Sequence, residues 1–265
     1  MILTNSTSQL WLIGGTRESS RLAREIVSLG IPCLVTVTTD AARSLYPKAD
    51  NLQVAVLSLQ KQTIDSFCQE NSIRAILDAS HPYAVFISKL AIAVASQRQI
   101  PYLRFEREAV ETQEASEVNV IYLDSFETLL ASDYLNQQRA LLTVGYKVLP
   151  LFCQWQNRST LFARILPSLH SLEVAFAAGF SSERIIALRP PFSIPFEIAL
   201  WHHWNISLVV TKASGVPGGE DIKRTVAIEL GIPLIVISRP AIEYPQQTSQ
   251  LSVAIEFCQR NIRES

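Results

Sequence analysis

The chain has 265 residues, of which 48% are hydrophobic and 18% are charged, and its formal net charge is −1. A domain usually has about 100 to 150 residues, so this length predicts two folded lobes. The hydrophobic content argues against a disordered chain. A net charge near zero argues against general nucleic-acid binding, although local basic clusters can still recognise an anionic ligand.

The cysteines are far apart in the sequence, and none has a second cysteine or a histidine at metal-ligand spacing. We expect buried, reduced thiols and no metal site. The polar start of the chain, Met1–Gln9, lacks a basic residue and predicts no signal peptide. No apolar run approaches the roughly 20 residues needed to span a bilayer, so we expect a cytoplasmic protein without a membrane association. The four cysteines are Cys33, Cys68, Cys153 and Cys258.

The first part of the chain alternates short apolar runs with longer amphipathic stretches, the pattern of parallel strands joined by helices. Gly30 and Pro32 mark the end of the first expected helix. The expected strands are residues 10–13, 33–38, 52–56, 73–77 and 102–105, and the expected helices are residues 18–29, 63–70 and 84–97.

A polar, aperiodic segment, Arg107–Asn119, predicts a linker. We therefore expect two lobes, residues 1–112 and residues 113–265, in an α/β fold with parallel sheets. The order of the strands in each sheet does not follow from the sequence. The strands expected in the second lobe are residues 120–123, 140–144, 161–165, 185–188, 208–211 and 234–238, with a closing helix at about 251–261.

The two halves of the chain share a recurring sequence pattern. Asp78-Ala79-Ser80 ends a strand in the first half, as Lys212-Ala213-Ser214 does in the second. Ile100-Pro101 and Ile232-Pro233 each open the following strand. Two similarly built lobes would explain this order, and so would the general resemblance of βα units to one another.

The turn Gly14-Gly15-Thr16 lies directly after a hydrophobic strand and directly before a helix. Backbone amides and the helix dipole can hold a phosphate at such a turn. The full G-x-G-x-x-G fingerprint of dinucleotide sites is incomplete, because Ser19 and Ser20 stand near the place of the third glycine. An ordinary tight turn is the alternative, and the strand-to-helix context favours a phosphate site.

Cofactor preference depends on the end of the second strand, near Thr38. Asp40 is the only acid there that could bind a ribose hydroxyl, whereas Arg43 could pair with a 2′-phosphate. We expect NADPH rather than NADH. A solvated loop arginine is the alternative role for Arg43.

The segment from Asp78 to Tyr83 ends an interior strand and opens a helix, so its side chains should face the crevice at the carboxyl ends of the strands. Ser80 suits a helix cap, and Pro82 suits a first helical turn. His81 is not explained by these structural roles and is a candidate for catalysis.

The loop Lys212–Gly219 follows a strand and precedes a helix. Its Ser214, Gly215, Gly218 and Gly219 suit the close approach of an anionic or planar ligand. It is not a Walker loop, because its lysine precedes the glycines; a flexible linker is the alternative. The basic residues that could face a ligand crevice, or lie on the surface instead, are Arg17, Lys147, Arg164 and Lys223.

Taken in order, four motifs resemble the precorrin-6A reductase family of cobalamin biosynthesis, including its cobalt-precorrin-6A branch. The resemblance spans nearly the whole chain. The motifs are residues 12–18 (LIGGTRE), residues 78–84 (DASHPYA), residues 100–107 (IPYLRFER), and residues 212–215 (KASG) followed by residues 231–233 (GIP) and 238–240 (SRP).

This resemblance implies two Rossmann-like lobes, with NADPH and a tetrapyrrole meeting in the cleft between them. It implies hydride delivery to one macrocycle double bond, completed by a solvent proton. Gly14, Gly15 and Thr16 match the family's glycine-rich turn, and Ser80 and His81 match its D-[AT]-[ST]-H-P segment. The chain departs from the family pattern by lacking a tryptophan at residues 107–110 and by having Pro190 where the family has glycine.

Hydride transfer needs orientation and charge balance more than an acid–base pair. We expect Lys147, Arg164 and Lys212 to bind the substrate's carboxylates, Lys212 to support developing charge, and His81 to relay the proton. Two other functions fit a two-lobed cleft. One is a nucleotide-sugar transferase, and the other is a nucleotide-binding sensor.

Overall fold

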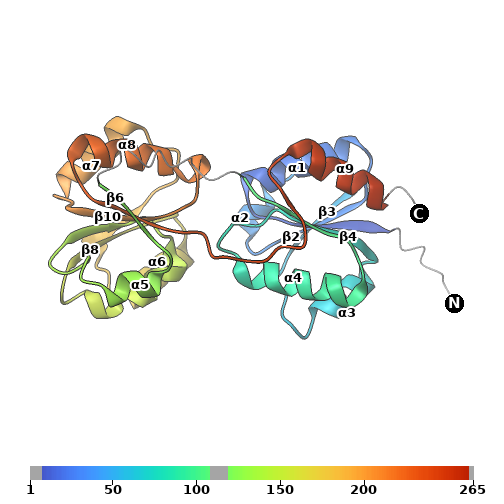
Figure 1. Cartoon of the computed structure of the whole chain (residues 1–265), viewed down its shortest axis with the longest axis horizontal. Coiled ribbons are helices and arrows are strands. Elements are labelled where there is room, and N and C mark those ends of the chain that lie inside the picture. The colour runs from blue at the N-terminus through green and yellow to red at the C-terminus, as the bar shows by residue number, and fades with distance from the viewer. Residues whose placement is uncertain (1–7, 108–118, 263–265) are drawn as a thin grey trace. The chain divides into compact units, whose positions relative to one another are not determined.

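The computed structural model describes residues 8–107 and 119–262, which form two compact units (Figure 1). The first unit comprises Met1–Glu108 together with Ala241–Ser265, and the second comprises Ala109–Pro240. Each unit contains one six-stranded parallel sheet. The α/β fold with parallel sheets predicted from the alternating pattern is confirmed.

In the first unit the sheet order is β12-β5-β4-β1-β2-β3. Starting from β3, this is the 3-2-1-4-5-6 order of dinucleotide-binding sheets. The strands are β1 (Gln9–Ile13), β2 (Cys33–Val37), β3 (Leu52–Val56), β4 (Ile73–Asp78), β5 (Tyr102–Phe105) and β12 (Gln247–Thr248). The helices are α1 (Arg17–Ser28), α2 (Asp40–Arg43), α3 (Ile64–Glu70), α4 (Val85–Arg98) and α9 (Leu251–Ile262).

In the second unit the sheet order is β6-β11-β10-β7-β8-β9, which is the same arrangement with β6 in the sixth place. The strands are β6 (Val120–Leu123), β7 (Arg139–Leu142), β8 (Thr160–Ile165), β9 (Ile185–Ala187), β10 (Leu208–Lys212) and β11 (Leu234–Ile237). The α-helices are α5 (Phe126–Ala131), α6 (Leu169–Ala177), α7 (Ile194–His203) and α8 (Glu220–Leu230). Short 3-10 helices are η1 (Tyr146–Trp155), η2 (Ser182–Arg184) and η3 (Val216–Gly218).

The two units exchange their sixth strands. β6 follows β5 along the chain but pairs with β11, and β12 follows β11 but pairs with β5. The predicted second lobe, residues 113–265, is therefore wrong at its C-terminal end. The cause is packing, because Ala254, Phe257 and Cys258 of α9 are buried in the core of the first unit. The predicted boundary after residue 112 falls in residues 108–118, outside the described residues.

Apolar side chains cover both faces of each sheet. In β1, Leu10 and Leu12 pack under α1 and α9, whereas Trp11 and Ile13 pack on the opposite face with α3 and α4. Figure 1 shows helices on both sides of the sheets. Burial on both faces explains why the strands are continuous apolar runs rather than alternating ones.

The cysteines are all free thiols, and three of them are buried. Burial raises the pKa of Cys33, raises that of Cys68 to about 11, and raises that of Cys258 to about 12. Cys153 is exposed in η1, so the expectation that all four are buried is wrong there. Among the described residues, none of the helices combines the length and apolar character needed to cross a bilayer.

Candidate functional site

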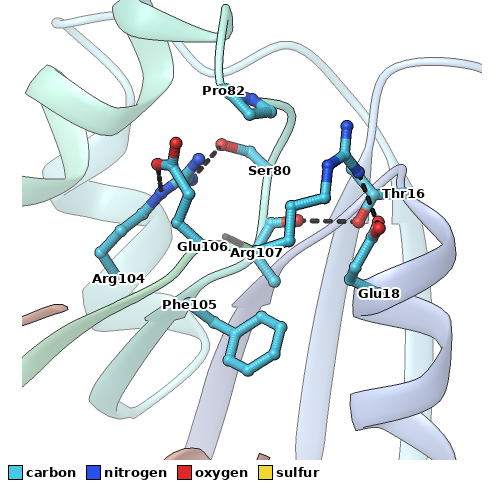
Figure 2. A pocket seen from close by; sticks show the side chains of 9 residues that line it. Thr16, Glu18, Ser80, Pro82, Arg104, Phe105, Glu106 and Arg107 are labelled. Atoms are coloured by element: carbon cyan, nitrogen blue, oxygen red, sulfur yellow. Dashed lines mark hydrogen bonds and ion pairs between the residues drawn. The ribbon is translucent and has the colours of Figure 1, made fainter. Parts of the chain in front are cut away.

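In the first unit, a small hollow that opens to solvent lies at the carboxyl ends of β1, β4 and β5 (Figure 2). These strands meet where the strand order reverses, the place at which open α/β sheets bind their ligands. The lining residues are Thr16, Glu18, Ala79, Ser80, Pro82, Arg104, Phe105, Glu106 and Arg107.

Thr16 joins two of the loops around this hollow. Its hydroxyl donates to the Ala79 carbonyl at 2.9 Å, which ties the turn after β1 to the turn after β4. The same oxygen accepts the Ser19 N–H at 3.0 Å, and the Ser19 hydroxyl accepts the Thr16 N–H at 3.0 Å. This reciprocal cap begins α1.

The two glycines of this turn are required for different reasons, a close contact at Gly14 and a positive φ at Gly15. A Cβ at Gly14 would lie 2.2 Å from the Tyr46 hydroxyl, so a side chain there collides. Gly15 has φ +103° with no atom within 4 Å of an added Cβ, so its backbone is open to close approach. The space at Gly15 and the helix end behind it fit a phosphate of a dinucleotide.

Tyr46 changes which groups such a phosphate could bind. Its hydroxyl accepts the Gly15 N–H at 2.7 Å and lies 2.7 Å from the Ser19 hydroxyl. Burial raises the pKa of Tyr46, so the phenol keeps its proton. The expected bare amide at Gly15 is therefore already hydrogen-bonded inside the protein, and the exposed Arg17 side chain is the cation on the first turn of α1.

Asp78, at the end of β4, is the centre of a buried polar network. One carboxylate oxygen accepts the Ser80 N–H at 3.0 Å and Arg104 Nη1 at 2.9 Å. The other accepts the Ser88 hydroxyl at 2.6 Å and the Tyr102 hydroxyl at 2.7 Å. Burial and the Asp78 carboxylate raise the pKa of Tyr102, which keeps that phenol a donor. Four donors fix this carboxylate as a structural anchor rather than a base.

Arg104 extends the network from β5 toward the hollow. Its Nη1 donates to the Ser80 hydroxyl at 3.1 Å, and its Nε donates to Glu106 at 2.9 Å. The Tyr244 ring lies against the guanidinium, 5.3 Å from ring centroid to Cζ. Since the Arg104 side chain is only 1% exposed, its charge is balanced by Asp78 and Glu106 rather than by water.

A second ion pair borders the hollow beside α1. Arg107 Nη1 donates to the Glu18 carboxylate at 2.7 Å, and both side chains are mostly buried. Burial alone would raise the pKa of Glu18, but its own N–H, Arg107 and the Thr16 hydroxyl together hold that pKa below its usual value. A carboxylate and a guanidinium that were not predicted as site residues therefore lie beside the start of α1.

The structure brings the predicted Gly14-Gly15-Thr16 turn and Ser80 to one edge of the sheet. His81 is close in sequence but exposed, and its Nδ1 accepts the Tyr83 N–H at 3.2 Å. The charged residues that line the hollow, Glu18, Arg104, Glu106 and Arg107, were not predicted as site residues, and neither was Asp78, the buried partner of Arg104. The available signal was a set of charged residues at the ends of buried strands.

The residues expected to select the cofactor lie at the end of β2. Thr38 is exposed, and Thr39 caps the short helix α2. Asp40 and Arg43, weighed as alternatives from the sequence, form an exposed ion pair at 3.8 Å. A pair of this kind is weak, so Arg43 can turn toward an incoming phosphate at small cost.

In the second unit the structure brings Lys212 near Lys147. Lys212 is the last residue of β10, and Lys147 lies in η1, which follows the neighbouring strand β7. Burial and the charge of Lys147 lower the pKa of Lys212 to about 8. The Lys212 ammonium also lies over the Phe126 ring, 5.8 Å from its centroid. Two cations this close favour an anionic ligand.

The loop after Lys212 is built as the glycines predicted. Gly215 and Gly219 have φ +71° and +65°, and a Cβ at Gly218 would lie 1.9 Å from the Ser214 hydroxyl. Glu220 accepts the Gly215 N–H at 2.8 Å. The buried Lys223 donates to the carbonyls of Gly218 and Gly219, at 2.7 and 3.0 Å. The loop is thus held from within by α8.

Arg164 does not lie with the two lysines as an available cation. Its Nη1 donates to Glu197 at 2.6 Å, and its side chain is 6% exposed. Glu197 also accepts the indole N–H of Trp201 at 3.0 Å. An interior carboxylate therefore balances the charge of Arg164, whose contact with substrate stays a prediction.

Comparison with known proteins gives the same family at several levels. The family described as precorrin-6x reductase CbiJ/CobK matches residues 9–259. A cobalt-precorrin-6A reductase of Synechocystis sp. is 46% identical over 263 residues, which is 98% of this chain and 99% of the relative. The cobalt-precorrin-6A reductase of Priestia megaterium is 34% identical, covering 88% of this chain and 91% of the relative.

More distant proteins agree. A precorrin-6A reductase of Rhodobacter capsulatus is 26% identical, covering 89% of each chain. The solved structure of CobK precorrin-6A reductase superposes with a TM-score of 0.79 at 21% identity, covering 96% of this chain and 98% of that one, which supports the fold. On the match to residues 9–259 and the 46% identity, this chain belongs to the precorrin-6x reductase CbiJ/CobK family.

Proposed function

We propose that this protein uses NADPH to reduce cobalt-precorrin-6A in cobalamin biosynthesis. The observation that carries the proposal is the 46% identity to a cobalt-precorrin-6A reductase along essentially the full length of both chains. The relatives at 34% and 29% identity carry the same name. The cobalt-bearing ring is therefore our proposed substrate, with metal-free precorrin-6A as the alternative.

The proposed reaction adds one hydride and one proton across one carbon–carbon double bond of the macrocycle. NADPH would supply the hydride and become NADP+, and solvent would supply the proton. The protein's part is to hold the two reactants in register and to balance charge, because the cofactor carries the redox chemistry.

The first unit is the proposed cofactor unit, supported by its dinucleotide-type strand order. The turn Gly14-Gly15-Thr16 would hold phosphate, with Arg17 as the nearby cation. At the other end of the cofactor's adenosine half, Arg43 would pair with the 2′-phosphate beside Thr38. Ser80 and His81 would lie on the nicotinamide side, after β4.

The second unit is the proposed substrate unit. The ammonium groups of Lys147 and Lys212 would bind peripheral carboxylates of the tetrapyrrole, and a bound carboxylate would return the pKa of Lys212 toward its ordinary value. Ser214, Gly215, Gly218 and Gly219 would let the backbone approach the flat ring. Lys212 would also support charge that develops on the ring, and His81 would relay the proton.

The deciding assay mixes purified protein with NADPH and enzymatically prepared cobalt-precorrin-6A, without oxygen, and follows the nicotinamide absorbance. Oxidation that requires both protein and ring would support the reductase. Running metal-free precorrin-6A in parallel decides between the two rings. Binding of NADPH without oxidation by either ring would instead support the nucleotide sensor, and turnover of a nucleotide sugar would support the transferase.

A further inference from the structure

We infer that Glu106, held by Arg104, lies against the nicotinamide end of the bound cofactor and favours its oxidised, positively charged form. The inference rests on the proposed function, because it concerns the cofactor of that reaction. Glu106 belongs neither to the glycine turn nor to the substrate lysines, so this role is additional to theirs.

The sheet order gives the direction of the cofactor. In sheets of this order the dinucleotide crosses the edge between β1 and β4, and its adenosine ribose is bound at the end of β2. The nicotinamide half must then extend over the ends of β4 and β5. Glu106 follows β5 directly and lines the hollow on that side, together with Ser80 of the β4 loop (Figure 2).

The charges around the hollow suit a cation better than a phosphate. Arg104 is 1% exposed and shares its single positive charge between Asp78 and Glu106, which are 0% and 9% exposed, so these three side chains keep one net negative charge. Arg107 neutralises Glu18 beside them, so the five charged side chains together carry one negative charge. The remaining negative charge lies in a mostly buried setting, where water screens it less than at the surface.

Arg104 fixes the direction of the Glu106 carboxylate. The guanidinium is itself held by Asp78, by the Ser80 hydroxyl and by the Tyr244 ring, so it cannot rotate away. Its Nε then holds Glu106 at 2.9 Å. Figure 2 shows this ion pair on one side of Ser80 and the Arg107–Glu18 pair on the other. A carboxylate fixed in this way needs no rearrangement to meet charge that develops beside it.

The test compares the two redox forms of the cofactor, because the nicotinamide ring is neutral in NADPH and positive in NADP+. The dissociation constants of both are measured by calorimetry for the full-length wild-type protein and for Glu106→Gln, which keeps the shape and removes the charge. We expect the ratio Kd(NADP+)/Kd(NADPH) to rise about tenfold in Glu106→Gln, the size of one partly screened charge pair.

Two further variants separate charge from structure. Glu106→Asp keeps the charge, so its ratio should stay near the wild-type value even if both affinities fall. Glu70→Gln, on exposed surface at the end of α3, should change neither constant. An equal change in both constants on removing the Glu106 charge would overturn this inference and leave the proposed function standing. Failure of the wild-type protein to bind either nucleotide would overturn both.

Discussion

The hydroxyl of Thr16 and the carbonyl of Ala79 are 2.9 Å apart, so one side chain joins the turn after β1 to the turn after β4 of the dinucleotide-type sheet. The residues are 63 positions apart in the chain. The same hydroxyl oxygen caps α1, so Thr16 contributes to the local helix and to the tertiary fold at once.

Replacing Thr16 with valine should therefore destabilise the first unit by about 1–2 kcal/mol, because a cap and a cross-turn hydrogen bond are both lost. Urea unfolding followed by circular dichroism measures this as a lower midpoint. Thr225→Ala is the matched control, since Thr225 is exposed and its hydroxyl bonds to the Asp221 carbonyl one turn earlier in α8. Equal midpoints for the two variants would contradict the dual role of Thr16.

Gly14 and Tyr46 should show strong coupling. An added methyl at Gly14 meets the Tyr46 hydroxyl, so Gly14→Ala should cost about 1–3 kcal/mol of unfolding free energy. Tyr46→Phe should cost about 1–3 kcal/mol by removing the partner of the Gly15 N–H. The double variant should lose less than the two costs combined, and thermal unfolding of all four proteins gives the coupling energy. Simple additivity would show that the hydroxyl is not what excludes a side chain.

The buried ion pair of Asp78 and Arg104 should be far more sensitive than an exposed one. Arg104→Met leaves the Asp78 charge without its guanidinium partner and should cost about 3–5 kcal/mol. Asp65→Asn removes the partially exposed pair of Asp65 with Arg98 and should cost less than about 1 kcal/mol. Urea midpoints rank the two variants, and comparable losses would mean that burial does not control the strength of these pairs.

Lys212 should impose a pH dependence on substrate affinity. Its pKa of about 8 means that the ammonium is present below pH 8 and lost above it, so KM for the tetrapyrrole should rise as pH increases through 8. Lys212→Arg should abolish this rise, because a guanidinium stays charged. Lys147→Ala removes a neighbouring charge and should move the rise to higher pH. Initial rates from pH 6.5 to 9.5 test this, and an unshifted profile in both variants would exclude Lys212 as the titrating group.

The lowered pKa of Lys212 should also make the unfolding free energy depend on pH. The folded state binds the Lys212 proton less tightly than the unfolded state, whose lysine has its ordinary pKa of 10.5. The contribution of Lys212 to the unfolding free energy should therefore increase as pH rises from about 8 toward 10.5. Lys212→Met should reduce this increase in urea titrations at pH 8 and pH 9.5. An unchanged pH dependence in the variant would argue against a depressed pKa.

The exchanged α9 predicts a remote effect. Phe257→Ala opens a cavity under the first sheet and should cost about 3–5 kcal/mol there. Hydrogen exchange read by mass spectrometry should accelerate in β1 and β4 but not in β7 or β10. The control is Phe176→Ala, since Phe176 is 52% exposed on α6. Faster exchange in β7 and β10 instead would place α9 energetically with the second unit.

The positions of the strands were predictable because buried parallel strands are short apolar runs bounded by glycine, proline and polar residues. All eleven expected strands occur with bounds shifted by two residues or fewer. β12 was missed because its two residues, Gln247 and Thr248, carry no apolar signal. The exchange of sixth strands was also invisible, since pairing partners far apart in sequence leave no local periodicity.

Part of the site was also predictable from the sequence, and part was not. Turn chemistry is local, so the Gly14-Gly15-Thr16 turn and the Ser80 loop could be located from the sequence. Charge burial is not local. Arg164, expected to face a ligand, is paired with Glu197, 33 residues away, and Asp78 is paired with Arg104, 26 residues away. From the sequence alone, an arginine at a strand end looks the same whether it faces a ligand or pairs with a buried carboxylate.

The exchange of sixth strands also orders events during synthesis on the ribosome. All strands of the second unit, through β11, leave the ribosome before β12 and α9 do. The second unit can therefore close while the apolar surface of the first sheet under α9 is still uncovered. A chaperone that shields exposed apolar surface would bind there after β5 has emerged and before α9 has.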